Sequence, residues 1–332
     1  IYNSQDDASV APNGDEDEGG FQTRRAKLNF DGHISSPKIG YHIQLMNDFP
    51  SGSVMINEYH VSYALNDNMT IYGGDIVLPF LREEIVDSKY QLAVERSTTN
   101  EFFTVGTSEG VKLEWASGEN TQIDIMFSDG ANSGMADFNQ DQSEMAVTAR
   151  IEHAWEGNLD SASDFTGWAG EEASLVTGGA VHYELGDGRN GGDADYFAYT
   201  VDVSYENESF NLYGAYVGAS IDPDSDAVDD RDMNGFVVQG GLDIVPDKFE
   251  LFARYAYIDG DIDGEDEANT WTFGGNYYVN GHKAKFTADV IWLGDDLPTA
   301  NPFGDDASSS GLGLITGTED EVAVRTQFQL LC

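Results

Sequence analysis

The chain has 332 residues, of which 60 are acidic and 16 are basic, so its formal net charge is -44. This charge argues against nucleic acid as a partner, because phosphate binding needs clustered Lys and Arg. Aromatic residues make up 12% of the chain, and 37 Gly stand beside only 8 Pro, which is a composition of strands and turns and not of a disordered acidic tail. No apolar run approaches the ~18 residues that a membrane-spanning helix needs. No linker or compositional break divides the chain, so we expect a single domain over residues 1–332.

The first 20 residues are acidic and predict a loop, with Ile1 and Tyr2 as the tail of a strand that begins upstream of Ile1. From Phe21 onward, apolar and polar residues alternate with the period of two that is typical of strands with two different faces. In residues 249–257 and 284–292, for example, apolar and aromatic side chains occupy every second position. We expect the apolar phase to face lipid or a neighbouring subunit, and the alternate phase to face water.

The lengths of the connections indicate how these strands are arranged. Tight turns alternate with long polar connections, which is typical of a transmembrane antiparallel up-and-down β-barrel. A soluble β-sandwich would also alternate in polarity, but it would not require this difference between the two ends. Residues 157–174 are an exception, and we interpret them as an elaborated periplasmic turn. About fifteen strands can be counted, and an upstream strand would bring the all-β barrel to about 16, the porin size.

One long connection, residues 78–107, carries apolar residues throughout and cations at a regular spacing. Arg82, Lys89 and Arg96 recur every seven residues, which on a helix opened by Pro79 would place them roughly on one face. The alternative interpretation is a surface helix with a solvated face. Within a membrane barrel, a long inserted loop usually narrows the pore, so we predict a constriction loop that carries these three cations.

Residues 21–115 resemble the phosphate-selective porin O and P family. The resemblance rests on FQTRRAKLNFDGHISSPKIGYHIQL, INEYHVSYAL, YGGDIVLPFLREE and SKYQLAVERS. In that family a double-Arg strand precedes a tight hairpin, and the constriction loop has a G-x-x-x-x-P-F-x-x-E stretch followed by E-R. Arg24 and Arg25 match the double Arg, and Lys89 and Arg96 match basic residues of the loop. The resemblance implies a homotrimer of 16-stranded barrels in the bacterial outer membrane, surrounded by lipid, with anion-conducting pores in the best-known members.

Half of the scarce cations fall on the predicted inward phase of the strands. These lumen-wall residues are Arg25, Lys27, Lys112, Arg150, Arg254, Lys283, Lys285 and Arg325. Acidic residues share the same phase, so the alternative interpretation is a set of ordinary lumen salt bridges. Because selectivity depends on charge at the narrowest point, the three loop cations are expected to matter more than the wall.

Other chemistry has few sequence signals. The six His residues are scattered without metal-ligand spacing, and no nucleophile motif is present, so neither an enzyme nor a resident cofactor is expected. Asp259, Asp261 and Asp263 form a D-x-D-x-D-G run that resembles the first half of a calcium loop. Calcium at this run is one hypothesis, and simple acidic loops solvated in a salty medium are the other.

These observations predict an outer-membrane porin that allows passive diffusion of ions and small hydrophilic solutes, anions such as phosphate among them. The alternative is a structural outer-membrane barrel whose acidic loops bind calcium or a surface-layer partner.

Overall fold

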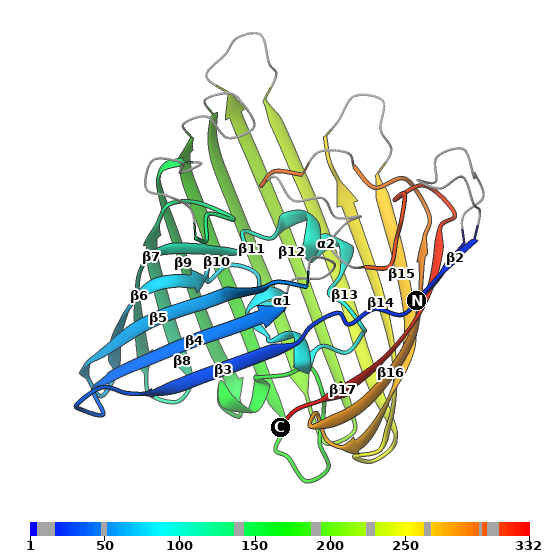
Figure 1. Cartoon of the computed structure of the whole chain (residues 1–332), viewed down its shortest axis with the longest axis horizontal. Coiled ribbons are helices and arrows are strands. Elements are labelled where there is room, and N and C mark those ends of the chain that lie inside the picture. The colour runs from blue at the N-terminus through cyan, green and yellow to red at the C-terminus, as the bar shows by residue number, and fades with distance from the viewer. Residues whose placement is uncertain are drawn as a thin grey trace.

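The structure is a computed structural model that describes residues 1–4, 17–47, 52–135, 143–186, 194–223, 230–261, 267–298, 301–303 and 312–332. The described residues form seventeen antiparallel strands arranged as a barrel around an inserted segment (Figure 1). The strands are β1 (Tyr2–Ser4), β2 (Asp17–Gly19), β3 (Lys27–His33), β4 (Ile39–Asn47), β5 (Val54–Asn66), β6 (Met69–Val77), β7 (Thr107–Ser117), β8 (Thr121–Ser128), β9 (Ser143–Glu156), β10 (Ser174–Gly186), β11 (Ala194–Glu206), β12 (Phe210–Pro223), β13 (Arg231–Val245), β14 (Phe249–Asp259), β15 (Ala268–Asn280), β16 (Ala284–Leu293) and β17 (Val322–Leu330).

The predicted all-β, antiparallel, up-and-down arrangement is confirmed. Each strand from β3 to β16 pairs with the next strand along the chain, as β3 with β4 and β16 with β17. The strand expected at Ile1 and Tyr2 is β1, which pairs with β17 through Tyr2 and Val324 and with β2 through Tyr2 and Gly19. The number of strands exceeds the expected 16 because residues 20–26 do not form a strand, so that β2 and β3 are separate.

The helical segments are short and lie in connections. They are α1 (Arg82–Ile85), η1 (Ser88–Tyr90), α2 (Thr98–Phe103) and η2 (Asp160–Ala162). No helix among the described residues has the length and apolar character needed to cross a bilayer. In Figure 1, α1 and α2 lie inside the ring of strands.

The outward phase of the strands is apolar, as predicted. Val61, Phe273 and Val290 all expose their side chains on the outer face, where Val61 is 52% accessible. Their neighbours on the opposite phase point into the barrel, because successive side chains of a strand alternate between its two faces.

The expectation that the inward phase faces water is wrong for much of β9 to β17. Thr270, Thr287 and Asp289 are inward but almost completely buried. The reason is that three connections fold into the barrel and cover this wall. Residues 78–106 contribute Leu78, Phe80 and Phe103 to the largest buried cluster. Residues 157–173 and the connection between β16 and β17 add further apolar side chains, Phe165 in one case and Leu297, Phe303, Leu312 and Leu314 in the other.

The opposite exposure of adjacent residues on β5 provides a test of the register. Val61→Arg would place a charge on the lipid-facing surface and should cost ~2–4 kcal/mol if the residue lies near the bilayer midplane. Ser62→Arg should cost less than about 0.5 kcal/mol, because Ser62 lies on the inward, half-buried phase of the same strand. The free energies of unfolding can be measured in lipid vesicles. Equal costs at the two positions would contradict the assigned faces.

Candidate pore constriction

The inserted loop, residues 78–106, connects β6 to β7 and is not the single continuous helix that would align its cations. α1 ends at Ile85 because Val86 takes an extended backbone, with ψ of 116°. Asp87 and Ser97 are also extended, at ψ of 142° and 157°, and their side chains cap η1 and α2 respectively. As a result, Arg82 lies in α1, Lys89 in η1 and Arg96 in the extended segment before α2.

Each of the three loop cations has a carboxylate partner. Arg82 is buried, with Nη1 3.2 Å from Glu152 and Nε donating to Ser204. Arg96 lies 3.3 Å from Glu84 and also donates to the carbonyl oxygens of Glu83 and Glu84. The positive charge of these arginines is therefore largely balanced within the protein.

Lys89 is the most accessible of the three loop cations, with 29% of its side chain exposed. Its ammonium lies 2.9 Å from Asp87 and 4.9 Å from the centre of the Tyr90 ring. Burial raises the pKa of Asp87, but its hydrogen bond and attraction to Lys89 outweigh burial, so that the pKa lies below its usual value. Burial lowers the pKa of Lys89, and Asp87 more than reverses that effect, so the pair remains ionised at neutral pH.

Three of the predicted lumen-wall cations hold the loop in place. Arg150 of β9 donates to the carbonyl oxygen of Phe80 at 2.9 Å. Arg254 of β14 donates to that of Glu95, and Lys285 of β16 to that of Gln91, both at 2.8 Å. All three side chains are buried. Their charges are directed at the backbone of the loop and not at open water.

Carboxylates and amides complete this attachment. Asp289 of β16 accepts a hydrogen bond from the Val94 N–H, and Asn276 of β15 donates to the carbonyl oxygen of Leu92. Thr99 of α2 donates to the carbonyl oxygens of Phe236 and Tyr257, which belong to β13 and β14. The loop is therefore fixed to the wall from β9 to β17.

The other predicted wall cations have different positions. Arg325 is buried, pairs with Asp289 at 2.7 Å and donates to the carbonyl oxygen of Leu312. Lys112 lies 3.8 Å from Glu114 and 3.9 Å from Asp124. Lys27 is exposed at the start of β3, where it interacts electrostatically with Asp87 of the loop. Lys283 is exposed in the turn between β15 and β16, outside the strand to which it was assigned.

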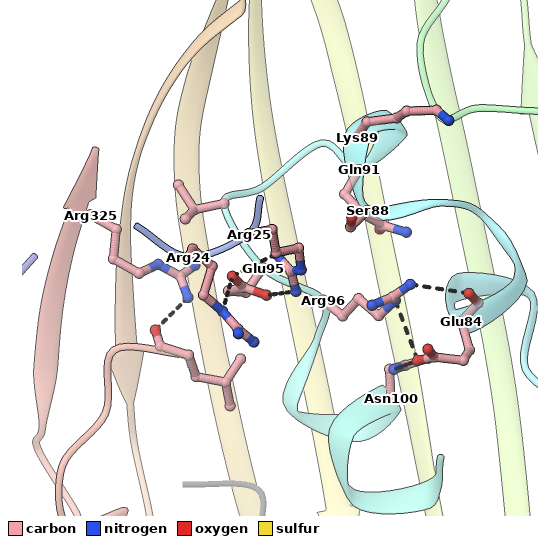
Figure 2. Close-up of polar contacts among 12 residues, drawn as sticks. Arg24, Arg25, Glu84, Ser88, Lys89, Gln91, Glu95, Arg96, Asn100 and Arg325 are labelled. Atoms are coloured by element: carbon pink, nitrogen blue, oxygen red, sulfur yellow. Dashed lines mark hydrogen bonds and ion pairs between the residues drawn. The ribbon is translucent and has the colours of Figure 1, made fainter. Parts of the chain in front are cut away.

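Glu95 is a residue of the candidate site that the spacing of charges in the sequence does not reveal. It is buried, with 2% of its side chain exposed, and it binds two arginines of the segment before β3. Arg25 reaches both of its oxygens, at 2.9 and 2.5 Å, and Arg24 Nε lies 2.8 Å away (Figure 2). Figure 2 also shows Arg96 extending away from this cluster toward Glu84. The only sequence signal was the adjacent E-R pair.

Glu83 organises the loop from within. Its carboxylate accepts hydrogen bonds from the N–H and hydroxyl of Ser97, at 2.7 and 2.6 Å, and lies 3.3 Å from Arg254. Its carbonyl oxygen accepts from Gln91 and Arg96. Gly74, just before the loop, has a φ of +146°, and a Cβ there would overlap the carbonyl of Tyr59. The G-x-x-x-x-P-F-x-x-E and E-R residues thus determine the shape of the loop.

Residues 157–173 form a second inserted segment and not only an elaborated turn. Phe165 packs with Val86 and Leu92 of the loop, and its ring lies 5.8 Å from the Arg82 guanidinium. Asp164 lies 3.0 Å from His282, whose pKa is lowered by burial although Asp164 opposes that effect. This segment supports the side of the loop that carries Arg82.

The water-exposed part of the interior lies beside β3 to β7. Most inward side chains on these strands remain partly or fully exposed, among them Lys27, Asp31, Glu58 and Glu114. Glu58 of β5 interacts electrostatically with Lys27 and with Asp87 of the loop, so charges of the wall and the loop face each other here. The accessible charges are of both signs. The candidate constriction is the space between this wall and the Glu84–Lys89 part of the loop.

The calcium hypothesis concerns Asp259, Asp261 and Asp263. The structure describes Asp259 and Asp261, and Asp263 lies outside the described residues. Asp259 accepts hydrogen bonds from Asn234 and from the Asp261 N–H, and Asp261 accepts from the Asp232 N–H. Within the described ranges, no group of three or more His, Cys, Asp or Glu residues is placed to hold a metal ion.

Comparisons with known proteins agree with this geometry. The sequence model described as "Phosphate-selective porin O and P" matches residues 2–162 and 170–330. No curated protein sequence matches the chain.

Solved structures share the fold at low sequence identity. The anion-selective porin from Comamonas acidovorans is 13% identical, with a TM-score of 0.64 and coverage of 98% of this chain and 94% of its own. OmpT, an outer membrane protein of Vibrio cholerae, is 10% identical, with a TM-score of 0.59 and coverage of 92% and 89%. The outer membrane channel DcaP of Acinetobacter baumannii is 14% identical, with a TM-score of 0.55 and coverage of 91% and 83%.

Glu95→Gln tests whether the pair of arginines holds the loop. Breaking a fully buried ion pair costs ~3–5 kcal/mol, but Arg24 is about one third exposed, so we expect a loss of stability of about 1–3 kcal/mol. The noise of the open-channel current should increase as the loop loosens. Glu114→Gln, which removes a more exposed carboxylate 3.8 Å from Lys112, serves as the control and should change stability by less than about 0.5 kcal/mol. Equal effects of the two substitutions on stability and noise would contradict this role of Glu95.

Proposed function

The chain belongs to the phosphate-selective porin O and P family and is a porin channel of the bacterial outer membrane; from this premise, we propose that it passes small hydrophilic solutes passively between the inserted loop and the wall formed by β3 to β7. The proposal needs no bond chemistry. The observation that carries it is the contrast between the two sides of the barrel. Most inward residues of β9 to β17 are buried, whereas most of those on β3 to β7 remain partly or fully exposed.

We propose weak anion preference, or none, at high salt. The three loop cations that motivated anion selectivity each lie within 4 Å of a carboxylate, which reduces their effect on passing ions. Small anions such as phosphate would then be among several permeant solutes. The Comamonas acidovorans relative is described as anion-selective, which supports including anions among the permeant solutes.

Ionic strength should change this preference. The Debye length is ~8 Å at physiological salt and ~30 Å at 0.01 M, so distant loop carboxylates act on the pore only when salt is low. With a net charge of -44, the protein should then favour cations. A homotrimeric assembly, as the family resemblance implies, is part of the same proposal. The alternative of a structural barrel is less favoured, because the family and the structural relatives are porins and channels.

Planar-bilayer conductance is the basic test of the proposed channel. Substitution of Lys89 and of Asp87 then tests whether this pair lies at the constriction. Lys89→Gln should shift the reversal potential in a salt gradient toward cation preference, and Asp87→Asn should shift it toward anion preference. Lys38→Gln, in the exposed hairpin turn between β3 and β4, removes the same charge away from the loop and should leave the potential unchanged. Shifts of equal size for Lys38 and Lys89 would show that the pair is not at the constriction. A protein without conductance would contradict the proposed function itself.

A further inference from the structure

Two histidines stand next to each other on the water-exposed inner wall of the barrel. His42 of β4 is directly opposite His60 of β5 in the strand register, and Asp31 of β3 is directly opposite His42 on the other side. Residues that are directly opposite each other point to the same face of a sheet. Because Asp31 is on the inward phase, the row formed by these three side chains crosses the accessible wall. The strand register, and no local spacing in the sequence, brings the two imidazoles together.

The two imidazole rings are already close to each other. Their centroids lie 5.3 Å apart, and the ring planes are stacked at an angle of 22°. The ring of Tyr72 on β6 packs edge-on against the other side of His60, also with a centroid distance of 5.3 Å. The χ2 torsion of His has a broad minimum, so small rotations can direct one nitrogen of each ring toward a shared ion at little cost.

Asp31 determines which nitrogen of His42 is available. Its Oδ1 lies 2.6 Å from His42 Nδ1. A carboxylate in this position holds a proton on Nδ1 and leaves the lone pair of Nε2 free, which is how carboxylates orient the histidines that bind zinc in proteins. The side chain of His42 is 18% exposed, so an ion in the water-filled interior can reach it.

His60 has a ring nitrogen that the protein does not use. Its Nδ1 is buried and has no hydrogen-bond partner among the described residues. The residue opposite His60 on β6 is Gly74, which has no side chain that could serve as a partner. Buried polar groups of proteins usually have a partner. No described residue therefore competes with an ion for this nitrogen.

The charges around the histidines allow a cation to bind. Lys112 of β7 is a nearby cation, but its ammonium lies 3.8 Å from Glu114 and 3.9 Å from Asp124. These two carboxylates offset its repulsion of a second cation. Asp31 adds a negative charge directly beside the imidazoles.

We propose that His42 and His60 form a binding site on the pore wall for a divalent late transition-metal ion, with Cu²⁺ as the ion bound most tightly. Imidazole suits Cu²⁺, Ni²⁺ and Zn²⁺, and Cu²⁺ stands highest in the usual order of affinities. The ion would bind Nε2 of His42, one nitrogen of His60 and water. Only two side chains bind it, so the site differs from the groups of three or more ligands that the described ranges lack.

A bound ion would change conduction, and this consequence rests on the proposed function. His42 interacts electrostatically with Glu58, which faces Asp87 of the inserted loop, so the site lies beside the candidate constriction. Selectivity depends on charge near the narrowest point of a channel. Two added positive charges should therefore reduce the current of cations and shift the reversal potential toward anion preference.

The direct test measures Cu²⁺ binding to the full chain in detergent by titration calorimetry. Electron paramagnetic resonance of the bound Cu²⁺ should show two nitrogen ligands, and this readout needs no substitution. Asp31→Asn should weaken the affinity ~10–100-fold, as expected for a group that orients a ligand. His42→Gln and His60→Gln should each weaken it further. Unchanged affinity in any of these three variants, or a spectrum without nitrogen ligands, would overturn the proposal.

His153→Gln is the matched control, because it removes an imidazole of β9 that is bonded to Thr121 and lies away from the pair. Its affinity for Cu²⁺ should equal that of the unsubstituted protein, and an equal loss in this variant would show that Cu²⁺ binds elsewhere. In planar bilayers, Cu²⁺ should reduce the current of the unsubstituted channel and not that of His42→Gln. A channel that conducts but binds no Cu²⁺ would contradict the metal site alone, whereas a protein that binds Cu²⁺ without conducting would contradict the proposed function alone.

Discussion

The structure depends on hydrogen bonds from buried cations of the barrel wall to the backbone of the inserted loop. Arg150, Arg254 and Lys285 reach the carbonyl oxygens of Phe80, Glu95 and Gln91 from three different strands. A loop that forms only short helices has many carbonyl groups that need partners when it is buried. Charged donors make stronger hydrogen bonds than neutral ones, so long basic side chains are suited to holding such a loop.

This attachment determines where solutes can pass. Because the loop and residues 157–173 pack against one side of the barrel, the accessible interior lies beside β3 to β7. The use of basic residues to attach the loop also reduces the positive charge that is accessible to solutes. The chain has only 16 Lys and Arg residues, and several of them bind carbonyl oxygens or partner carboxylates inside the protein. Few remain accessible to attract anions, which is why we propose weak selectivity for a member of a family that is named for phosphate.

The sequence predicted the barrel, because the alternation of polarity along a strand follows directly from the geometry of the backbone. It also located the inserted loop, through its length and through the motif residues Pro79, Phe80 and Glu83. The same alternation could not show whether an inward side chain meets water or protein. Thr287 and Lys285 were therefore expected to face water, although they are buried beneath the loop.

The periodicity of the sequence also could not predict contacts between segments that are far apart in the chain. The seven-residue spacing of Arg82, Lys89 and Arg96 predicted a shared face, but Val86, Asp87 and Ser97 take extended backbones that place these cations on separate turns. Glu95 lies 71 residues from Arg24 and 70 residues from Arg25, so no local pattern could show that these side chains meet.

The most direct test of the central claim is the accessibility of single thiols on the two sides of the barrel. In a Cys332→Ser background, Ser62→Cys on β5 and Thr287→Cys on β16 both place a thiol on the inward phase of a strand. A small, charged, water-soluble thiol reagent should modify Ser62→Cys during conduction and reduce the current. Thr287→Cys should remain unreactive, because the loop covers it. Rapid modification of Thr287→Cys, with loss of current, would show that solutes reach the wall that we describe as closed.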